Sequence, residues 1–106
     1  MRIPEDLIIP EAKITQYLLV LKTRNDKFRF LGQAGFTQEN PEDLTLAIQK
    51  QAIDKEAIEE KTNEYGTFYQ VKGELIGVNR ISLSVTTVWL QRQMDGKFQF
   101  VTLKPN

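Results

Sequence analysis

Apolar and polar residues alternate along the second half of the chain, and this alternation constrains the fold most strongly. From Ile81 to Trp89, the odd-numbered positions hold large apolar side chains except at Thr87, and Ser82, Ser84 and Thr86 place small hydroxyl side chains at even-numbered ones. Successive side chains of a strand point to opposite faces, so the pattern predicts a sheet with one buried face. The period of two predicts strands at residues 57–62, 67–75, 80–91 and 97–103.

Short turn motifs separate these predicted strands. Met94-Asp95-Gly96-Lys97 is typical of a tight hairpin, because glycine accepts the positive φ that such turns require. Asn63-Glu64-Tyr65-Gly66 and Gly77-Val78-Asn79 mark the other two reversals. Sequential hairpins predict a four-stranded antiparallel meander.

Before residue 57 the apolar residues are spaced as on helices. Pro10 suits a first helical turn, and Ile14, Leu18 and Leu21 follow at spacings of four and three, which predicts a helix over residues 10–21. Asn40 as N-cap, Pro41 and two acidic residues predict a helix that continues to about residue 54.

Residues 26–35 fit two structures. Lys27-Phe28-Arg29-Phe30 alternates as a strand does. However, Phe28 and Leu31 also share a helical face, Asp26 can cap the start, and Gly35 suits a left-handed stop. The second interpretation, a short helix, is favoured.

Together these elements predict an α+β fold, with two or three N-terminal helices followed by a four-stranded antiparallel meander sheet. A chain of 106 residues forms one domain, so residues 1–106 are expected to share a single core. In that core the strand residues Leu83, Val85 and Trp89 are predicted to pack against helix residues, which are Leu18, Leu44 and Ile48.

The amino-acid composition limits the catalytic and metal-binding chemistry that the chain can perform. The chain has no Cys and no His, which excludes disulfides, thiolate metal sites and Cys nucleophiles and removes the usual general base. Glu59 and Glu60 are neighbours on a predicted strand and would face opposite ways, so they do not predict a metal site. No glycine-rich phosphate loop is present, and no metal or cofactor is expected. The N-terminus lacks the apolar core of a signal peptide and no apolar run approaches a membrane span, so we expect a cytoplasmic protein with no membrane partner.

The charge is balanced overall but not along the chain. Lys and Arg number 14, as do Asp and Glu. Residues 1–64 carry 9 basic and 12 acidic residues, whereas residues 65–106 carry 5 and 2. Two interpretations are open: chance clustering on a solvated surface, or a positive sheet side that meets an anionic partner.

Three basic or aromatic residues are candidates for phosphate chemistry. The segment 22–29 is rich in Lys and Arg with interleaved Phe, so Lys27 is predicted to contact a phosphate, as is Arg80. The alternative is that the Phe residues belong to the core and the charges are solvated. Tyr65 is the candidate acid or base.

Thr87 and Thr102 are candidate orienting hydroxyls. Thr87 stands where the apolar pattern expects a core residue, and a buried hydroxyl there needs a hydrogen-bond partner. That partner is either a neighbouring strand or Tyr side chain, which is the structural interpretation, or a ligand. Both threonines are expected on strands of the sheet.

The order and spacing of eight short blocks resemble a small bacterial family, the domain of unknown function 6883. These blocks cover residues 7 to 105 and are Tyr17-Leu18-Leu19, Lys27-Phe28 with Phe30, Gly35-Phe36, Pro41-Glu42-Asp43-Leu44, Tyr65-Gly66-Thr67, Val71-Lys72-Gly73-Glu74-Leu75, Thr87-Val88-Trp89 and Val101-Thr102. The family looks like one found at the ends of phage-head and polymorphic-toxin proteins. The resemblance therefore implies a toxin-type domain.

The order of helices first and meander after is also similar to that of RelE, barnase and colicin-type RNase toxins, at the level of fold alone. RNA cleavage by attack of a 2′-hydroxyl needs no metal and suits a chain without His. The leading hypothesis is a metal-independent endoribonuclease toxin, with RNA as substrate and a small cognate antitoxin or immunity protein as partner. The alternative is a non-catalytic protein-binding module, such as an antitoxin, immunity protein or adaptor. Convergence of Lys27, Tyr65, Arg80 and Thr102 in one cleft would favour the enzyme.

Overall fold

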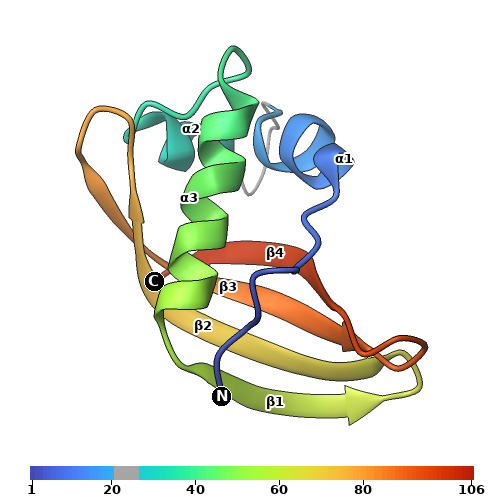
Figure 1. Cartoon of the computed structure of the whole chain (residues 1–106). Helices are drawn as coiled ribbons and strands as arrows, with labels where there is room; N and C mark the ends of the chain where they lie inside the picture. The colour runs from blue at the N-terminus through green and yellow to red at the C-terminus, as the bar shows by residue number, and fades with distance from the viewer. Residues whose placement is uncertain (21–26) are drawn as a thin grey trace.

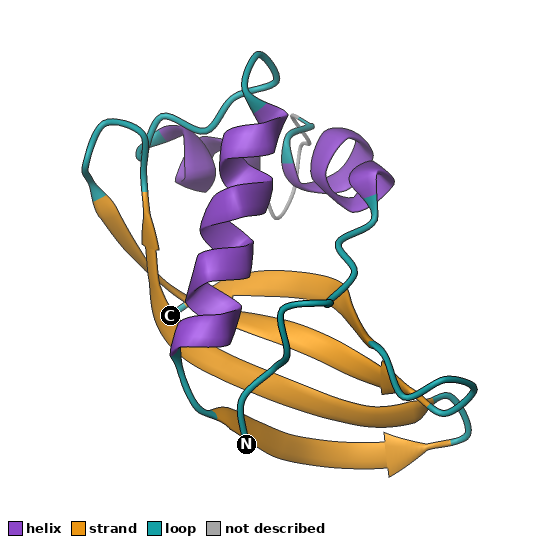
Figure 2. Ribbon diagram, in the orientation of Figure 1, coloured by secondary structure: helices purple, strands orange, loops and turns teal. Residues whose placement is uncertain are grey.

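The computed structural model describes residues 1–20 and 27–106, which form two layers. Helical segments cover one face of a curved antiparallel sheet, and the N-terminal segment crosses toward the sheet edge (Figures 1 and 2). The elements follow the chain as α1 (Glu11–Lys13), η1 (Ile14–Leu18), α2 (Lys27–Gly32), α3 (Pro41–Asp54), β1 (Ala57–Asn63), β2 (Gly66–Ile76), β3 (Ser82–Arg92) and β4 (Phe98–Pro105). The predicted α+β fold is confirmed.

The first predicted helix is shorter and wider than expected. After one α-helical turn in α1 the chain continues as a π-helix, η1, in which the Leu19 N–H donates to the Ile14 carbonyl at 3.0 Å. The predicted end at residue 21 lies outside the described residues. No helix in the described ranges is both long and apolar enough to cross a membrane.

The ambiguous segment is a helix from Lys27, as favoured, and Asp26 lies outside the described residues. Gly35 follows with a φ of 85°, the left-handed stop that the sequence indicates. The helix α3 has the predicted bounds, but its predicted side-chain cap is wrong. The Asn40 amide faces back, where its Oδ1 accepts from the Thr37 N–H at 2.7 Å and its Nδ2 donates to the Gly35 carbonyl at 2.9 Å.

The sheet has the order β1-β2-β3-β4, so each strand pairs with its neighbour in the chain. All eleven residues of β2 pair with β3, whereas β1 reaches only as far as Val71. Val88 pairs with Thr102 and Trp89 pairs with Phe100, so β4 has one extra residue between these two pairs. This β-bulge lies on the edge strand, where bulges commonly re-aim side chains.

The core lies between the helices and one face of the sheet. The six predicted core residues are buried in one cluster, which confirms that packing prediction. Ile81 is the exception to the alternation: it precedes β3, is 48% exposed and lies outside the cluster. The reason is that the β2–β3 turn extends through Arg80, so the regular strand starts one residue later than Ile81.

An ion pair closes the β3–β4 hairpin. The Arg92 guanidinium donates to both Asp95 carboxylate oxygens, and the Lys97 N–H donates to Asp95 Oδ1 at 3.0 Å. These hydrogen bonds, chiefly the one from Arg92, lower the pKa of Asp95 from 3.8 to about 2. The fold therefore favours the ionised carboxylate.

Asp95→Asn is expected to flatten the acid end of the stability profile. A carboxylate with a depressed pKa stabilises the fold above the unfolded-state pKa, and the contribution is lost as pH falls through the folded-state value. Between pH 4 and pH 2 the wild type should therefore lose more stability than Asp95→Asn. Urea unfolding midpoints across this range would measure the difference, and parallel profiles would contradict it.

Candidate functional site

Lys27, Tyr17 and Thr102 form a polar cluster at the β4 edge of the sheet. The Lys27 ammonium donates to the Tyr17 hydroxyl and to Thr102 Oγ1, each at 2.9 Å. The two hydroxyl oxygens lie 3.1 Å apart, so the three groups are in mutual contact. The cluster is half-buried.

Three separate elements supply these groups. Tyr17 lies on η1, Lys27 is the first residue of α2, and Thr102 lies on the edge strand β4, beside the bulge. They are 10 to 85 positions apart in the sequence. The helical layer therefore brings a cation to the Thr102 hydroxyl on the edge strand β4.

The charge of Lys27 is not neutralised within the described residues. Its ammonium contacts two neutral hydroxyls and the Tyr17 ring, whose centroid is 5.0 Å from Nζ. Among residues 1–20 and 27–106, the ion pairs join Arg92 to Asp95 and the N-terminal amine to Glu56. An ammonium has three donors, so one N–H of Lys27 is available to an anion. The arrangement suits phosphate or carboxylate.

Tyr65 and Arg80 do not join this cluster. Tyr65 is 66% exposed in the β1–β2 turn, and Arg80 lies in the β2–β3 turn with a φ of 71°. The eleven residues of β2 separate them, which places them roughly 30 Å apart at about 3.3 Å per residue. Of the four residues expected to converge, the structure thus brings together Lys27 and Thr102.

Thr87 belongs to a buried network. It is fully buried, and its hydroxyl donates to Gln51 Oε1 at 2.8 Å and accepts from Trp89 Nε1 at 2.9 Å. Gln51 in turn donates to the Val71 carbonyl at 2.9 Å, so α3 is fixed to the sheet. The partner that its hydroxyl needs is supplied by the protein itself, and no surface ligand reaches it in this structure.

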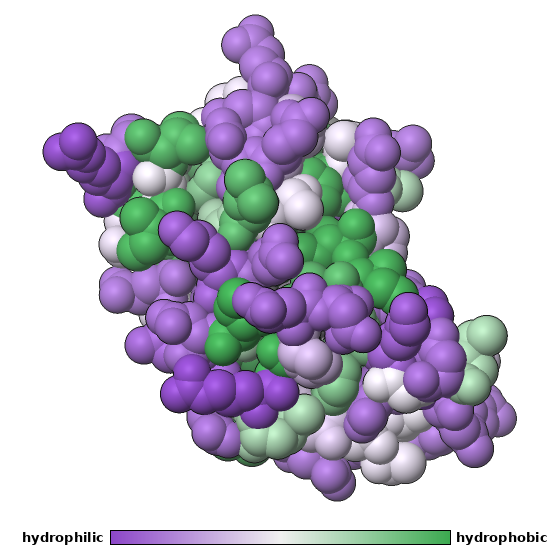
Figure 3. Space-filling view, in the orientation of Figure 1, coloured by the Kyte–Doolittle hydropathy of each residue, from purple (hydrophilic) through white to green (hydrophobic). Residues whose placement is uncertain are grey.

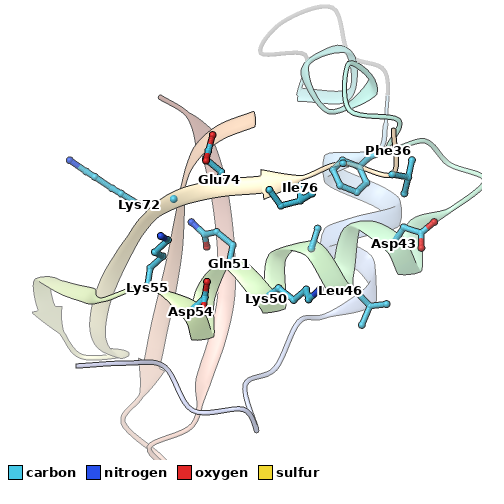
Figure 4. A pocket seen from close by; sticks show the side chains of 14 residues that line it. Phe36, Asp43, Leu46, Lys50, Gln51, Asp54, Lys55, Lys72, Glu74 and Ile76 are labelled. Carbon is cyan, nitrogen blue, oxygen red and sulfur yellow. The ribbon is translucent and has the colours of Figure 1, made fainter. Parts of the chain in front are cut away.

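A groove of about 620 Å³ lies between α3 and the part of β2 that β1 leaves unpaired (Figure 4). Exposed apolar side chains surround it, with Leu46 57%, Ile76 61% and Val78 51% exposed. Lysines and acids also line it, and Figure 3 shows hydrophobic side chains interrupted by polar ones beside α3. The groove suits an apolar segment of another protein more than a small charged molecule.

Nothing in the described ranges gathers three or more acidic side chains that could hold a metal ion. Sequence reasoning missed Tyr17 as a site residue, because its position beside the apolar stripe of Ile14 and Leu18 identified it as a core contact. Its ring does pack against the core, while its hydroxyl reaches the cluster. A polar tip on a half-buried aromatic residue was the available signal.

The fold and the edge cluster define a class: small α+β domains with helices on one face of an antiparallel meander. Within this class, the chain belongs to the family described as Domain of unknown function (DUF6883), whose model matches residues 3–106. The resemblance that the sequence blocks indicate is thereby confirmed. No curated protein matches the sequence.

A solved structure shares the fold. It is a chain in a contact-dependent growth inhibition toxin–immunity protein complex from Klebsiella pneumoniae 342, with a TM-score of 0.72 and 17% identity. The match covers 93% of this chain and 99% of that chain. At this identity the similarity extends to the fold alone.

Proposed function

We propose that the chain is a toxin-type domain that cleaves RNA without a metal ion and is held inactive by a cognate immunity protein or antitoxin. The observation that carries the proposal is the ammonium of Lys27, held by two hydroxyls and without an acidic partner in the described part of the chain. Such a group stabilises negative charge that develops on a phosphate.

Cleavage needs three functions around the phosphate. The 2′-oxygen attacks phosphorus while the bond to the 5′-oxygen breaks, which leaves a cyclic phosphate and a 5′-hydroxyl. A base accepts the 2′-hydroxyl proton, and an acid supplies one to the leaving oxygen. We assign charge stabilisation to Lys27 and orientation of both groups to Thr102, and the Tyr17 hydroxyl is the acid that protonates the leaving 5′-oxygen. The 2′-hydroxyl proton passes to water, from which Tyr17 regains its own. In this proposal Tyr17 takes the role that sequence reasoning gave to Tyr65.

The proposed immunity or antitoxin partner is based on the solved structure that shares the fold. The chain from Klebsiella pneumoniae 342 comes from a toxin–immunity complex, so its fold occurs in a two-protein growth inhibition system. This supports a toxin or immunity role for the present chain. The lysine cluster, rather than the fold, favours the toxin.

Lys27→Ala is expected to relieve growth arrest caused by the wild-type chain. Expression in a bacterium without the neighbouring gene should stop growth and fragment cellular RNA, and the variant should cleave about 10²-fold more slowly because a charge-stabilising donor is lost. Lys50→Ala is the matched control, since Lys50 is an exposed lysine on α3. Circular dichroism would verify that both variants fold.

One outcome would contradict the proposal that the chain is an enzyme. A folded wild-type chain that accumulates without harm and leaves RNA intact would favour the second candidate, a non-catalytic protein-binding module. The groove beside α3 supports that candidate, because exposed apolar side chains gather there. Leu46→Asp would then abolish partner binding, whereas an enzyme would retain its RNA cleavage.

A further inference from the structure

The strand register assigns residues to a second face of the sheet, the one opposite the helices. On β3, Val85 and Trp89 belong to the core, and Thr87 bonds to Gln51 of α3. Side chains alternate along a strand, so Thr86 and Val88 lie on the opposite face. The helical segments all lie on the other side of the sheet (Figure 2).

Two lysines flank Thr86 on this opposite face. Lys72 of β2 and Lys104 of β4 are the direct cross-strand partners of Thr86. Directly opposed residues share a face, and strands are about 4.8 Å apart, so the two lysine Cα atoms lie roughly 10 Å apart. Figure 4 shows the Lys72 side chain pointing away from Gln51 and α3. We call Lys72, Thr86 and Lys104 the lysine row.

The lysine row adjoins the candidate site. The next row of the same face contains Gln70, Val88 and Thr102. Thr102 stands two positions from Lys104 on the edge strand β4, and at this edge its hydroxyl accepts from Lys27 of the helical layer. The lysine row is thus connected to Lys27 through the edge strand β4.

The lysine row is positively charged. Lys72 and Lys104 are exposed, and neither forms an ion pair within the described residues. Glu74, opposite Ser84, is the acidic side chain that the register places beside the row. Farther along the face, the Arg92 charge is paired with Asp95. Two of the five basic residues of positions 65–106 are thus brought together by the pairing register.

We propose that this face is a binding surface for single-stranded RNA, in which Lys72 and Lys104 contact backbone phosphates on either side of Thr86. The proposal names the substrate class of the site above and rests on the proposed function for its link to cleavage. Cations spaced over hydroxyl and amide side chains complement a chain of repeated negative charges. The exposed apolar side chains that a protein partner could cover, Leu46, Ile76 and Val78, line the groove beside α3, and Lys72 lines that groove too.

The affinity for RNA should fall with salt concentration, with a slope set by the number of phosphates contacted. The probe is a fluorescent oligouridylate with 2′-O-methyl groups, which cannot undergo 2′-oxygen attack. For single strands, log K falls with log salt with a slope near −0.7 per phosphate contacted. The double variant Lys72→Ala/Lys104→Ala should weaken low-salt binding about tenfold or more and reduce the slope by about 1.4, the value for two contacts. Lys50→Ala/Lys55→Ala, which removes the same charge from the α3 side, should change neither quantity.

Two results would overturn the proposal: no binding of the oligonucleotide by wild type at low salt, or equal losses in the two double variants. If the Lys72/Lys104 variant bound RNA normally but lost affinity for an acidic partner protein, the face would be a protein-binding surface and the proposal would be wrong.

Cleavage of a dinucleoside monophosphate, with its single phosphate, separates this proposal from the proposed function. The Lys72/Lys104 variant should retain that activity, and Lys27→Ala should lose it. Oligonucleotide binding at the lysine row without any cleavage would refute the enzyme and leave the binding surface in place.

Discussion

Trp89→Ala is expected to lower the free energy of unfolding by roughly 3–5 kcal/mol, the usual cost of truncating a fully buried large aromatic residue. Trp89 is fully buried, and its ring packs edge-on against Phe100 with 5.5 Å between centroids. Its indole N–H also donates to the Thr87 hydroxyl. The substitution therefore removes apolar burial, opens a cavity and leaves a buried hydroxyl with one partner fewer.

Urea unfolding followed by circular dichroism measures this cost without relying on the tryptophan itself. Leu46→Ala is the control, because Leu46 is 57% exposed and its loss should stay within about 0.5 kcal/mol. The wild-type Trp89 fluorescence should be blue-shifted and resistant to aqueous quenchers. Strong quenching, or a Trp89→Ala cost close to that of the control, would contradict the packing of the core.

The sequence predicted the sheet well because its signals are local. Alternation in residues 82–86 reflects the pleat of a single strand, and Gly96 marks the hairpin with a φ of 73°. The bounds of α3 were also predictable, since Pro41 and the acidic residues after it define a first turn. Each of these features depends on neighbours in the chain.

The candidate site could not be predicted as a whole, because it depends on contacts between distant segments. Lys27 and Thr102 are 75 positions apart, and no local pattern predicts that the first residue of α2 will contact the edge strand β4. Tyr17, which contacts both residues, lies on the π-helical turn η1, whose backbone hydrogen bonds have no simple sequence signature. The bulge on β4 determines the register of Thr102, and no sequence pattern predicts it either.

The interpretation of Thr87 shows how an exception to a pattern becomes informative. A hydroxyl at an apolar position could mean a ligand or an internal partner, and the sequence left both open. The structure supplies the internal partner as Gln51, a polar residue on the face of α3 that packs against the sheet. The hydroxyl of Thr87 at an expected core position was the sequence signal of a buried hydrogen bond, and its partner Gln51 was not predicted.

Thr87→Val is expected to lower the free energy of unfolding by roughly 2–6 kcal/mol, even though it preserves the shape of the side chain. Replacing the hydroxyl with a methyl group leaves Gln51 Oε1 and Trp89 Nε1 buried without this partner. Each buried polar group that loses its hydrogen bond costs about 1–3 kcal/mol. Urea unfolding at neutral pH measures the total.

Thr87→Ser is the matched control, because it keeps the hydroxyl and removes a methyl group worth about 1 kcal/mol. The indole N–H resonance of Trp89 gives a second readout: its exchange with solvent should accelerate in Thr87→Val and not in Thr87→Ser. If valine costs no more than serine, the hydrogen bonds of Thr87 do not stabilise the fold. The hydroxyl would then have to be explained by a ligand, which is the interpretation that the buried network argues against.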